Sequence, residues 1–478
     1  MKKYMNWMLA AIMICGASVF TSCTNDASDN PSPEQPKKNR AEFIKHTRQN
    51  LKEVAENLNF SSWKVANEIN NNFNQYVLAN PSFGKTITTM FGQTIEQTIK
   101  PVEKGSELEQ MGFKMYAILD LSAFKYRFKL DPKNELFAVE PAEDFEMIVP
   151  TVNSQTQQLV EEGVKVSLKA GGSTYQQIMK LFSTDELAVV ALIPTDFAFG
   201  ISVKEDKVWT EVFNGSFKNE FRMRNGSGHV SLVDDAFNIS GTITSFLPSV
   251  AEKGLTGDAT TIHFAIGQDP AIHTAGLNLT FIHNGRTMLG LRGVLENLNG
   301  HAQLPQFSDG NMNIAEAFTA IMAGNSLKEG VFTLIDDLTT SLTVSDCGKV
   351  LELQHAMANA RRNYADKKTI DEYTQQLNEL VSGTMTCKGL NQTIPMRMQT
   401  IKFGVDYWAM PALNFADENG YVALTDMLDK ESVEYMVNIV DHAAGPMQQS
   451  IVTMRQFHQF VQTLISAIKE RQHTIIRH

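Results

Sequence analysis

Residues 277–292, LNLTFIHNGRTMLGLR, carry the strongest fold signal in this chain of 478 residues. Apolar and polar residues alternate from Leu277 to Phe281, and the alternation resumes beyond Asn284-Gly285. A period of two is typical of a strand with one buried face. Asn-Gly suits a two-residue turn, because both turn positions need a positive φ and these residues tolerate it. The segment therefore predicts a β-hairpin.

Two further Asn-Gly pairs, Asn214-Gly215 and Asn225-Gly226, occur earlier in the chain, and the first follows an alternating run. Together these signals predict an antiparallel β region over residues 125–303. Short helices laid against or between its strands are expected over residues 151–162, 173–182 and 245–253. Antiparallel sheets commonly leave one face in water, so the apolar-rich face of this sheet needs a cover.

Helical spacing precedes this region. Between residues 41 and 124, apolar side chains recur three and four positions apart, first from Phe43 to Leu58 and then from Trp63 to Val77. Further helices are expected over residues 83–100 and 106–121. This part of the chain is therefore predicted to be a helical segment.

Helical spacing returns after the β region, so residues 304–478 are predicted to be mainly helical. One strand pair interrupts them at about residues 396–415. Helices are expected over residues 313–343, over a pair of helices after Cys347, and over residues 424–442 and 446–470. The whole pattern predicts an α+β fold, in which an antiparallel, hairpin-rich curved sheet is covered by helices from both ends of the chain.

The amino end has the features of an export signal. Lys2 and Lys3 precede an apolar run over residues 7–19, which Phe20-Thr21-Ser22-Cys23 follows. The run is short for a membrane span. A basic start and a small-residue end are what a cleavable targeting segment requires.

Residues 20–23 resemble the lipobox of bacterial lipoproteins, and the style of the segment is similar to that of Bacteroidetes lipoproteins. Phe20 and Ser22 stand where Leu and then Gly or Ala are commonest. The resemblance implies removal of residues 1–22 and attachment of three acyl chains to Cys23, and more than one chain anchors a protein effectively permanently. Cys15 is the competing lipid site, but the bulky residue before it disfavours cleavage there. The resemblance ends near residue 40, and the body of the chain matches no family pattern.

Residues 23–40 are expected to form a tether. Apart from Cys23 itself, they hold no apolar residue larger than Ala27, and they contain three prolines, a composition that cannot bury a core. The folded body is expected to begin near Ala41. Thr24 at the second mature position fits the outer membrane, so the resemblance implies a lipid-anchored envelope protein facing either the periplasm or the cell surface.

The formal net charge of the chain is −11, and loss of Lys2 and Lys3 would make it −13. An acidic surface disfavours nucleic acid as a partner. The expected partners are the membrane, through the N-terminal lipid, and a glycan, an apolar ligand or another envelope protein.

Cys347 and Cys387 remain in an oxidising compartment once Cys23 carries lipid. Helical spacing before and after residue 365 predicts an antiparallel helical hairpin whose open end holds both cysteines. A disulfide between them would close a loop of about 40 residues and stabilise the fold by roughly 4 kcal/mol. The alternatives are a metal pair or two reduced thiols, and no His or Cys stands nearby in sequence to complete a zinc site.

Patterns that carry catalysis are incomplete in this sequence. Ser61-x-x-Lys64 and Ser82-x-x-Lys85 match the spacing of penicillin-binding enzymes, but the Lys-Thr-Gly strand of those enzymes is missing. Gly-x-Ser-x-Gly and phosphate-binding glycine loops are absent. The segment from Asp309 to Glu316 fits a helix cap better than a calcium loop, because Ile314 stands where the loop needs glycine. We therefore expect no cofactor, no metal and no visible catalytic residue.

Tyr407-Trp408 is the best candidate for an exposed aromatic that stacks on a sugar ring. Adjacent strand residues face opposite ways, so one of the two can be exposed. Core packing is the competing explanation for both.

Three functions are consistent with these features. The first is a non-catalytic, membrane-tethered binding or cargo protein. The second is a structural or assembly component of the envelope, which a large exposed apolar patch would favour over a deep pocket. The third is a hydrolase whose site is assembled from residues distant in sequence.

Overall fold

The computed structural model describes residues 37–57, 77, 80–152, 158–179, 187–205, 207–222, 236–246, 259–269, 274–297, 325–363, 365–403, 405–436 and 438–439. The chain forms two compact units. Unit 1 contains Met1–Phe60 and Ile262–Met447, and unit 2 contains Ser61–Thr261 and Gln448–His478. The described elements are mixed α and β with mostly strands in antiparallel-rich sheets, which confirms the coarse fold class.

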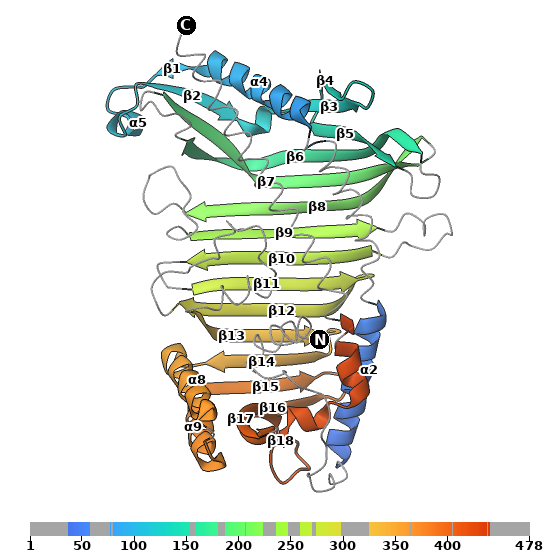
Figure 1. Ribbon diagram of the computed structural model, residues 1–478, viewed down its shortest axis with the longest axis vertical. Helices are drawn as coiled ribbons and strands as arrows, with labels where there is room; N and C mark the ends of the chain where they lie inside the picture. The colour runs from blue at the N-terminus through green and yellow to red at the C-terminus, as the bar shows by residue number, and fades with distance from the viewer. Residues whose placement is uncertain are drawn as a thin grey trace. The chain divides into compact units, whose positions relative to one another are not determined.

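In unit 1, each strand from β11 to β18 pairs antiparallel with the next one along the chain (Figure 1). β10, at Ala259–Asp269, crosses the boundary between the units. The strands are β11 Thr274–His283, β12 Arg286–Asn297, β13 Asn325–Leu334, β14 Leu338–Val344, β15 Val381–Cys387, β16 Gln392–Phe403, β17 Asp406–Leu413 and β18 Val422–Ala423.

The predicted helical hairpin is confirmed as α8, Cys347–Arg362, and α9, Lys367–Leu380. Both helices begin with an aspartate cap, because Asp346 and Asp366 accept hydrogen bonds from backbone N–H groups in the first turn. α9 packs on β16. The Asn378 side chain exchanges two hydrogen bonds with the backbone of Met398.

Helix α2, Lys38–Asn57, belongs to the same unit. Figure 1 shows it at the end of the strands opposite to α8 and α9. Phe43 of α2 is almost fully buried and meets the ring of Phe415 edge-on, with the centroids 5.4 Å apart. The helix begins at Lys38, inside the range expected to be tether, so the folded body starts slightly earlier than predicted.

Unit 2 is built on long strands. β5 to β9 pair antiparallel in chain order, as do β3 and β4, while β2–β7 and β3–β5 are parallel pairs. The strands are β1 Lys100–Pro101, β2 Met115–Asp120, β3 Tyr126–Asp131, β4 Leu136–Pro141, β5 Phe145–Val152, β6 Leu159–Met179, β7 Leu187–Glu205, β8 Val208–Arg222 and β9 Ala236–Phe246.

Helix α4, Pro81–Thr98, covers part of this sheet. Asn80 caps it by accepting a hydrogen bond from the Ser82 amide, and Pro81 occupies its first turn, where a missing N–H costs nothing. Phe83 packs against Phe128 and Phe137, with ring centroids 5.8 and 5.0 Å apart. The expected helix over residues 83–100 is thus confirmed.

Several predicted helices are wrong. Of residues 106–121, only α5, Glu107–Gln110, is α-helical, and β2 follows it. The described parts of 151–162 and 173–182 lie in β5 and β6. The described part of 313–343 forms the β13–β14 hairpin. In that hairpin Leu338, Thr340, Leu342 and Val344 are buried at a period of two, and this alternation outweighs the weaker helical spacing.

The two Asn-Gly predictions that can be compared have opposite outcomes. Asn284-Gly285 forms the β11–β12 turn with φ of 49° and 79°, as predicted. Asn214-Gly215 lies inside the continuous strand β8, so that turn is wrong. A Cβ at Gly215 would stand 2.5 Å from Cε1 of Phe199, so glycine here permits close packing instead of a turn.

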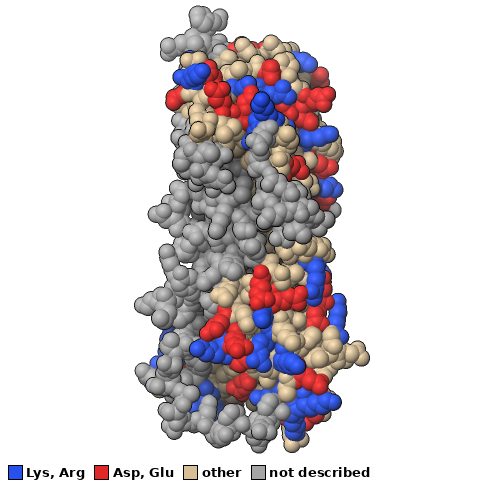
Figure 2. Space-filling model, turned by 90° about the vertical axis from the view of Figure 1, so that its right-hand side faces the viewer, with Lys and Arg blue, Asp and Glu red and all other residues tan. Residues whose placement is uncertain are grey.

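Several predictions fall outside the described residues. These are the leader, Cys23, most of the tether, Asn225-Gly226, and residues 446–470. No helix among the described residues has the length and apolar character needed to span a membrane. On the surface shown in Figure 2, Lys and Arg are interspersed with Asp and Glu on the described residues.

Candidate functional site

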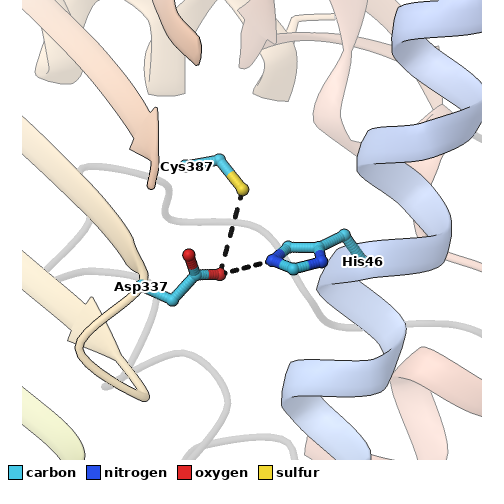
Figure 3. Close-up of side chains that lie close together, drawn as sticks. All are labelled: His46, Asp337 and Cys387. Atoms are coloured by element: carbon cyan, nitrogen blue, oxygen red, sulfur yellow. Dashed lines mark hydrogen bonds and ion pairs between the residues drawn. The ribbon is translucent and has the colours of Figure 1, made fainter. Parts of the chain in front are cut away.

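Three side chains from distant parts of unit 1 meet at one point (Figure 3). Ligand-capable atoms of His46, Asp337 and Cys387 all lie within 4.8 Å of one another. His46 comes from α2, Asp337 from the turn between β13 and β14, and Cys387 from the last position of β15. Among the described residues this is the one group of three or more His, Cys, Asp or Glu side chains with metal-site spacing.

The turn that presents Asp337 has an unusual backbone. Ile335 and Asp336 have φ of 54° and 53°, and the Asp337 amide donates to the Leu334 carbonyl over 3.1 Å, as in a type I′ hairpin turn. A left-handed conformation costs a residue with a Cβ roughly 1–2 kcal/mol. Two bonds to the neighbouring hairpin hold the turn, from the Ile335 amide to the Met288 carbonyl and from the Thr287 amide to the Asp336 carboxylate, each 3.1 Å long.

The Asp337 carboxylate accepts three short hydrogen bonds. Its Oδ2 lies 2.6 Å from His46 Nε2 and 2.6 Å from Asn50 Nδ2, and its Oδ1 lies 2.6 Å from the Gly389 amide nitrogen. Burial acts most strongly and raises the pKa of Asp337, but the hydrogen bonds from Gly389, Asn50 and His46 together lower it below 3.8. The group is therefore a carboxylate at neutral pH.

Cys387 is fully buried, and its Sγ lies 3.9 Å from Asp337 Oδ2. Burial raises the pKa of the Cys387 thiol, and the negative charge of Asp337 adds to this shift, while backbone hydrogen bonds from Leu390 and Gly389 oppose it. The thiol is therefore protonated at neutral pH, unlike the thiolate of a reactive cysteine.

Gly389 makes room for the imidazole ring. A Cβ at this position would stand 2.7 Å from both Cε1 and Nε2 of His46. The loop that carries Gly389 is also fixed to the turn, because the Lys388 amide donates to the Asp337 carbonyl over 3.1 Å. All three elements thus converge on Asp337.

The order of the groups limits their chemistry. In a cysteine nucleophile site, the imidazole lies between the thiol and the carboxylate and removes the thiol proton. Here the carboxylate lies between the thiol and the imidazole (Figure 3). The cluster therefore does not have the geometry of nucleophilic catalysis. Thiolate, imidazole and carboxylate are, however, the ligand types that bind zinc.

The predicted disulfide is wrong, because neither Cys347 nor Cys387 is in a disulfide. β15 carries Cys387 to a position opposite Leu338, whereas Cys347 follows Val344 at the other end of β14. Six strand residues span about 20 Å at roughly 3.3 Å each. A disulfide needs Cα atoms about 4.4–6.8 Å apart.

The predicted aromatic pair lies on β17, away from this cluster. Trp408 is half-buried, and the Arg361 guanidinium of α8 lies 3.9 Å from the centroid of its ring. One face of the indole is therefore occupied by a cation. Tyr407 is also half-buried.

No local sequence pattern predicts this cluster, because its members lie far apart along the chain. His46 and Asp337 are separated by 291 positions. One local signal was present. His46 and Asn50 are four residues apart on a predicted helix, and such residues share a face.

Comparison with known proteins gives no relative for this chain. No family model, no curated protein and no solved structure matches it.

Proposed function

We propose that this chain is a lipid-anchored protein of the bacterial outer membrane that binds a ligand without transforming it. The lipobox at Cys23 supports the anchor. The order of groups in the His46–Asp337–Cys387 cluster favours binding over nucleophilic catalysis.

The main support for a tethered protein is the way in which α2 is attached to unit 1. This is the first described helix after the expected tether. Near its start, the Asn39 amide donates to Asp417 over 3.0 Å. Near its middle, His46 and Asn50 bind Asp337. Near its end, Glu53 forms an ion pair with Arg286. A helix held along its whole length is suited to connect a membrane tether to a folded body.

We further propose that the ligand is a glycan, because of the outward face of β14 and β15. Every outward position of these two strands is Ser or Thr, and Ser341 pairs with Thr384 as Thr343 pairs with Ser382. Hydroxyl groups donate and accept hydrogen bonds, as sugar hydroxyls do. Together with Thr393 of β16, we call this surface the hydroxyl face: Thr339, Ser341, Thr343, Ser382, Thr384, Thr386 and Thr393.

The arrangement expected from the sequence, a curved sheet covered by helices from both ends of the chain, is part of the proposal. Contacts of α2, and of α8 with α9, to the strands of unit 1 support it.

Metabolic labelling with an alkyne analogue of palmitate tests the anchor. Label should enter the wild-type chain and a Cys15→Ala control, and it should be lost from Cys23→Ala. Continued labelling of Cys23→Ala would refute the anchor.

Retention of the purified protein on immobilised bacterial polysaccharides tests the ligand. Replacing Thr343, Thr384 and Thr393 by Val keeps β-branched side chains on the strands but removes three hydroxyls. We expect this variant to bind at least roughly 10-fold more weakly, since each lost hydrogen bond contributes about 1 kcal/mol. Replacement of the same three residues by Ser is the matched control and should retain binding. Equal binding by the Val and Ser variants, or no glycan retained by the wild-type protein, would remove the hydroxyl face from the proposal.

A further inference from the structure

We propose that His46, Asp337 and Cys387 form a binding site for a divalent cation of the zinc class. The cation would be held by Nε2 of His46, a carboxylate oxygen of Asp337 and Sγ of Cys387, which lie within 4.8 Å of one another. This site lies entirely within unit 1 and does not depend on the lipid anchor or on the glycan.

The three donors select the metal. Zinc accepts nitrogen, sulfur and oxygen ligands, whereas calcium and magnesium require oxygen ligands. A cation with two positive charges, bound by a thiolate and a carboxylate, has no net charge. Burying an uncompensated charge costs a large free energy, so a metal site without net charge can be buried much more readily.

The spacing of the donors is close to that of a metal site. Ligands at about 2.0–2.3 Å from a tetrahedral zinc ion lie roughly 3.5 Å from one another. The Sγ to Oδ2 distance is 3.9 Å, and the Nε2 to Oδ2 distance is 2.6 Å, which is a hydrogen bond. To admit the ion, the imidazole and the carboxylate must separate by about 1 Å, which small side-chain rotations supply. Three protein ligands leave a fourth position for water.

Neighbouring groups already orient the ligands. Asn50 and the Gly389 amide hold the Asp337 carboxylate, and Gly389 lacks the side chain that would displace the His46 ring. Such outer partners fix ligand orientation in metal sites. The positive φ of Ile335 costs conformational free energy, and such backbone strain is often found where a functional side chain, here Asp337, is held in place.

The competing explanation is a purely structural role, in which hydrogen bonds join α2 to the sheet. The bonds from His46 and Asn50 to Asp337 are sufficient for that role. Cys387 adds only a long hydrogen bond from its thiol, with Sγ 3.9 Å from Asp337 Oδ2, and a thiol is a weak donor, so these bonds do not require a cysteine here. The position of this sulfur is what favours a metal.

Proton transfers accompany binding. The thiol releases one proton to solvent when the sulfur becomes a ligand. The proton that Nε2 of His46 donates to Asp337 must leave to solvent so that Nε2 can offer its lone pair, and the neutral imidazole then carries one proton on Nδ1. No oxidation or reduction is involved.

Titration of the mature full-length protein in detergent, after treatment with a chelator, tests the site. Zinc chloride is added against a chromogenic competitor, and cobalt(II) reports thiolate coordination through its near-ultraviolet charge-transfer band. We expect one zinc ion per chain and a cobalt–thiolate band. Cys387→Ser and His46→Gln should each weaken zinc binding roughly 100-fold or more, since even outer partners contribute 10–100-fold.

Matched variants separate a ligand role from a structural one. Cys347→Ser removes the other buried thiol among the described residues of unit 1, and His355→Gln removes an exposed histidine of α8. Both variants should bind zinc as the wild type does. Gly389→Ala keeps all three ligands but forces the His46 ring aside, and should weaken binding about 10-fold. Circular dichroism checks that each variant is folded, and Gly389→Ala replaces His46→Gln if the latter unfolds. Absence of stoichiometric zinc uptake by the wild-type protein, or wild-type affinity in folded Cys387→Ser, would overturn the proposal.

Discussion

Nε2 of His46 and Oδ2 of Asp337 lie 2.6 Å apart and join helix α2 to a hairpin turn 291 residues further along the chain. The contact is only partly exposed, with 27% and 15% of the two side chains accessible. A hydrogen bond to a carboxylate that is partly removed from water is stronger than one on an open surface. The pair therefore fixes α2, the first described helix, to the sheet of unit 1.

Replacing Asp337 by Asn should destabilise metal-free unit 1 at neutral pH by about 1–3 kcal/mol, because Asn cannot accept all three hydrogen bonds as a charged group does. The pKa of Asp337 is lower in the folded chain than its ordinary 3.8. Its stabilisation is therefore fully present above the unfolded pKa and is lost as the pH falls through the folded pKa. Urea denaturation at pH 7 and at pH 3 should show the difference between wild type and Asp337→Asn shrinking in acid. A constant difference would show that the charge of Asp337 does not stabilise the fold.

Cys347 and Cys387 should both react with an alkylating reagent in the denatured, non-reduced protein. Neither is in a disulfide, and both side chains are buried in the folded chain. We therefore expect protection of both thiols under native conditions and two added alkyl groups at these positions in guanidinium chloride, measured by mass spectrometry of peptides. Recovery of a peptide linked through these two sulfurs would contradict the structure.

Glu162 of β6 should stabilise unit 2 in a pH-dependent way. It forms ion pairs with Lys129 of β3 and Lys204 of β7. Hydrogen bonds from Lys129 and then Lys204 lower the pKa of Glu162 from 4.5 to about 2. The stabilisation is present above pH 4.5 and is lost as the pH falls toward 2.

Glu162→Gln should therefore lower the free energy of unfolding by about 1 kcal/mol at pH 7, since partly exposed pairs contribute little each. The effect should decrease at high salt. Chemical denaturation at two pH values and two salt concentrations measures it. A loss that is equally large at pH 2 would mean that the side chain acts through packing.

Lys207→Gly should stabilise unit 2 by about 1 kcal/mol. Lys207 is exposed in the turn between β7 and β8 and has φ of 72°, a conformation that costs a residue with a Cβ roughly 1–2 kcal/mol. Part of this gain is lost because glycine has more conformational freedom in the unfolded chain. Lys207→Ala is the control and should be close to neutral. A lower melting temperature for the glycine variant than for the alanine variant would refute this reading of the turn.

How far local sequence predicts this fold can be judged from Asn284-Gly285 and Asn214-Gly215. At Asn284-Gly285 the turn preference agrees with the pairing of β11 and β12, and the prediction is confirmed. At Gly215 the same dipeptide lies within a strand, because the neighbouring ring of Phe199 leaves space for glycine alone. The close packing of Gly215 against Phe199 joins β8 to β7, and a local sequence pattern cannot show a contact between two strands.

The helix predictions also fail where a tertiary contact decides the structure. The helical spacing of apolar residues predicts α2, α4, α8 and α9, because this spacing is contained in each segment itself. The β13–β14 hairpin lies in a segment whose apolar spacing predicts a helix, and its turn has Ile335 where a turn signal would have Asn or Gly. The tight turn is maintained by bonds to Met288 and Thr287 of β12, which are tertiary interactions. The candidate site was missed for the same reason, since Asp337 follows this turn.

The contacts of α2 also have a mechanical consequence. Asn39, His46 and Glu53 are bonded to separate parts of unit 1 and lie about two turns apart along the helix. A pull directed along the helix axis would load these bonds together, whereas a pull directed away from the sheet would break them in succession from Asn39. The resistance of the amino end to force should therefore depend on the direction in which it is drawn.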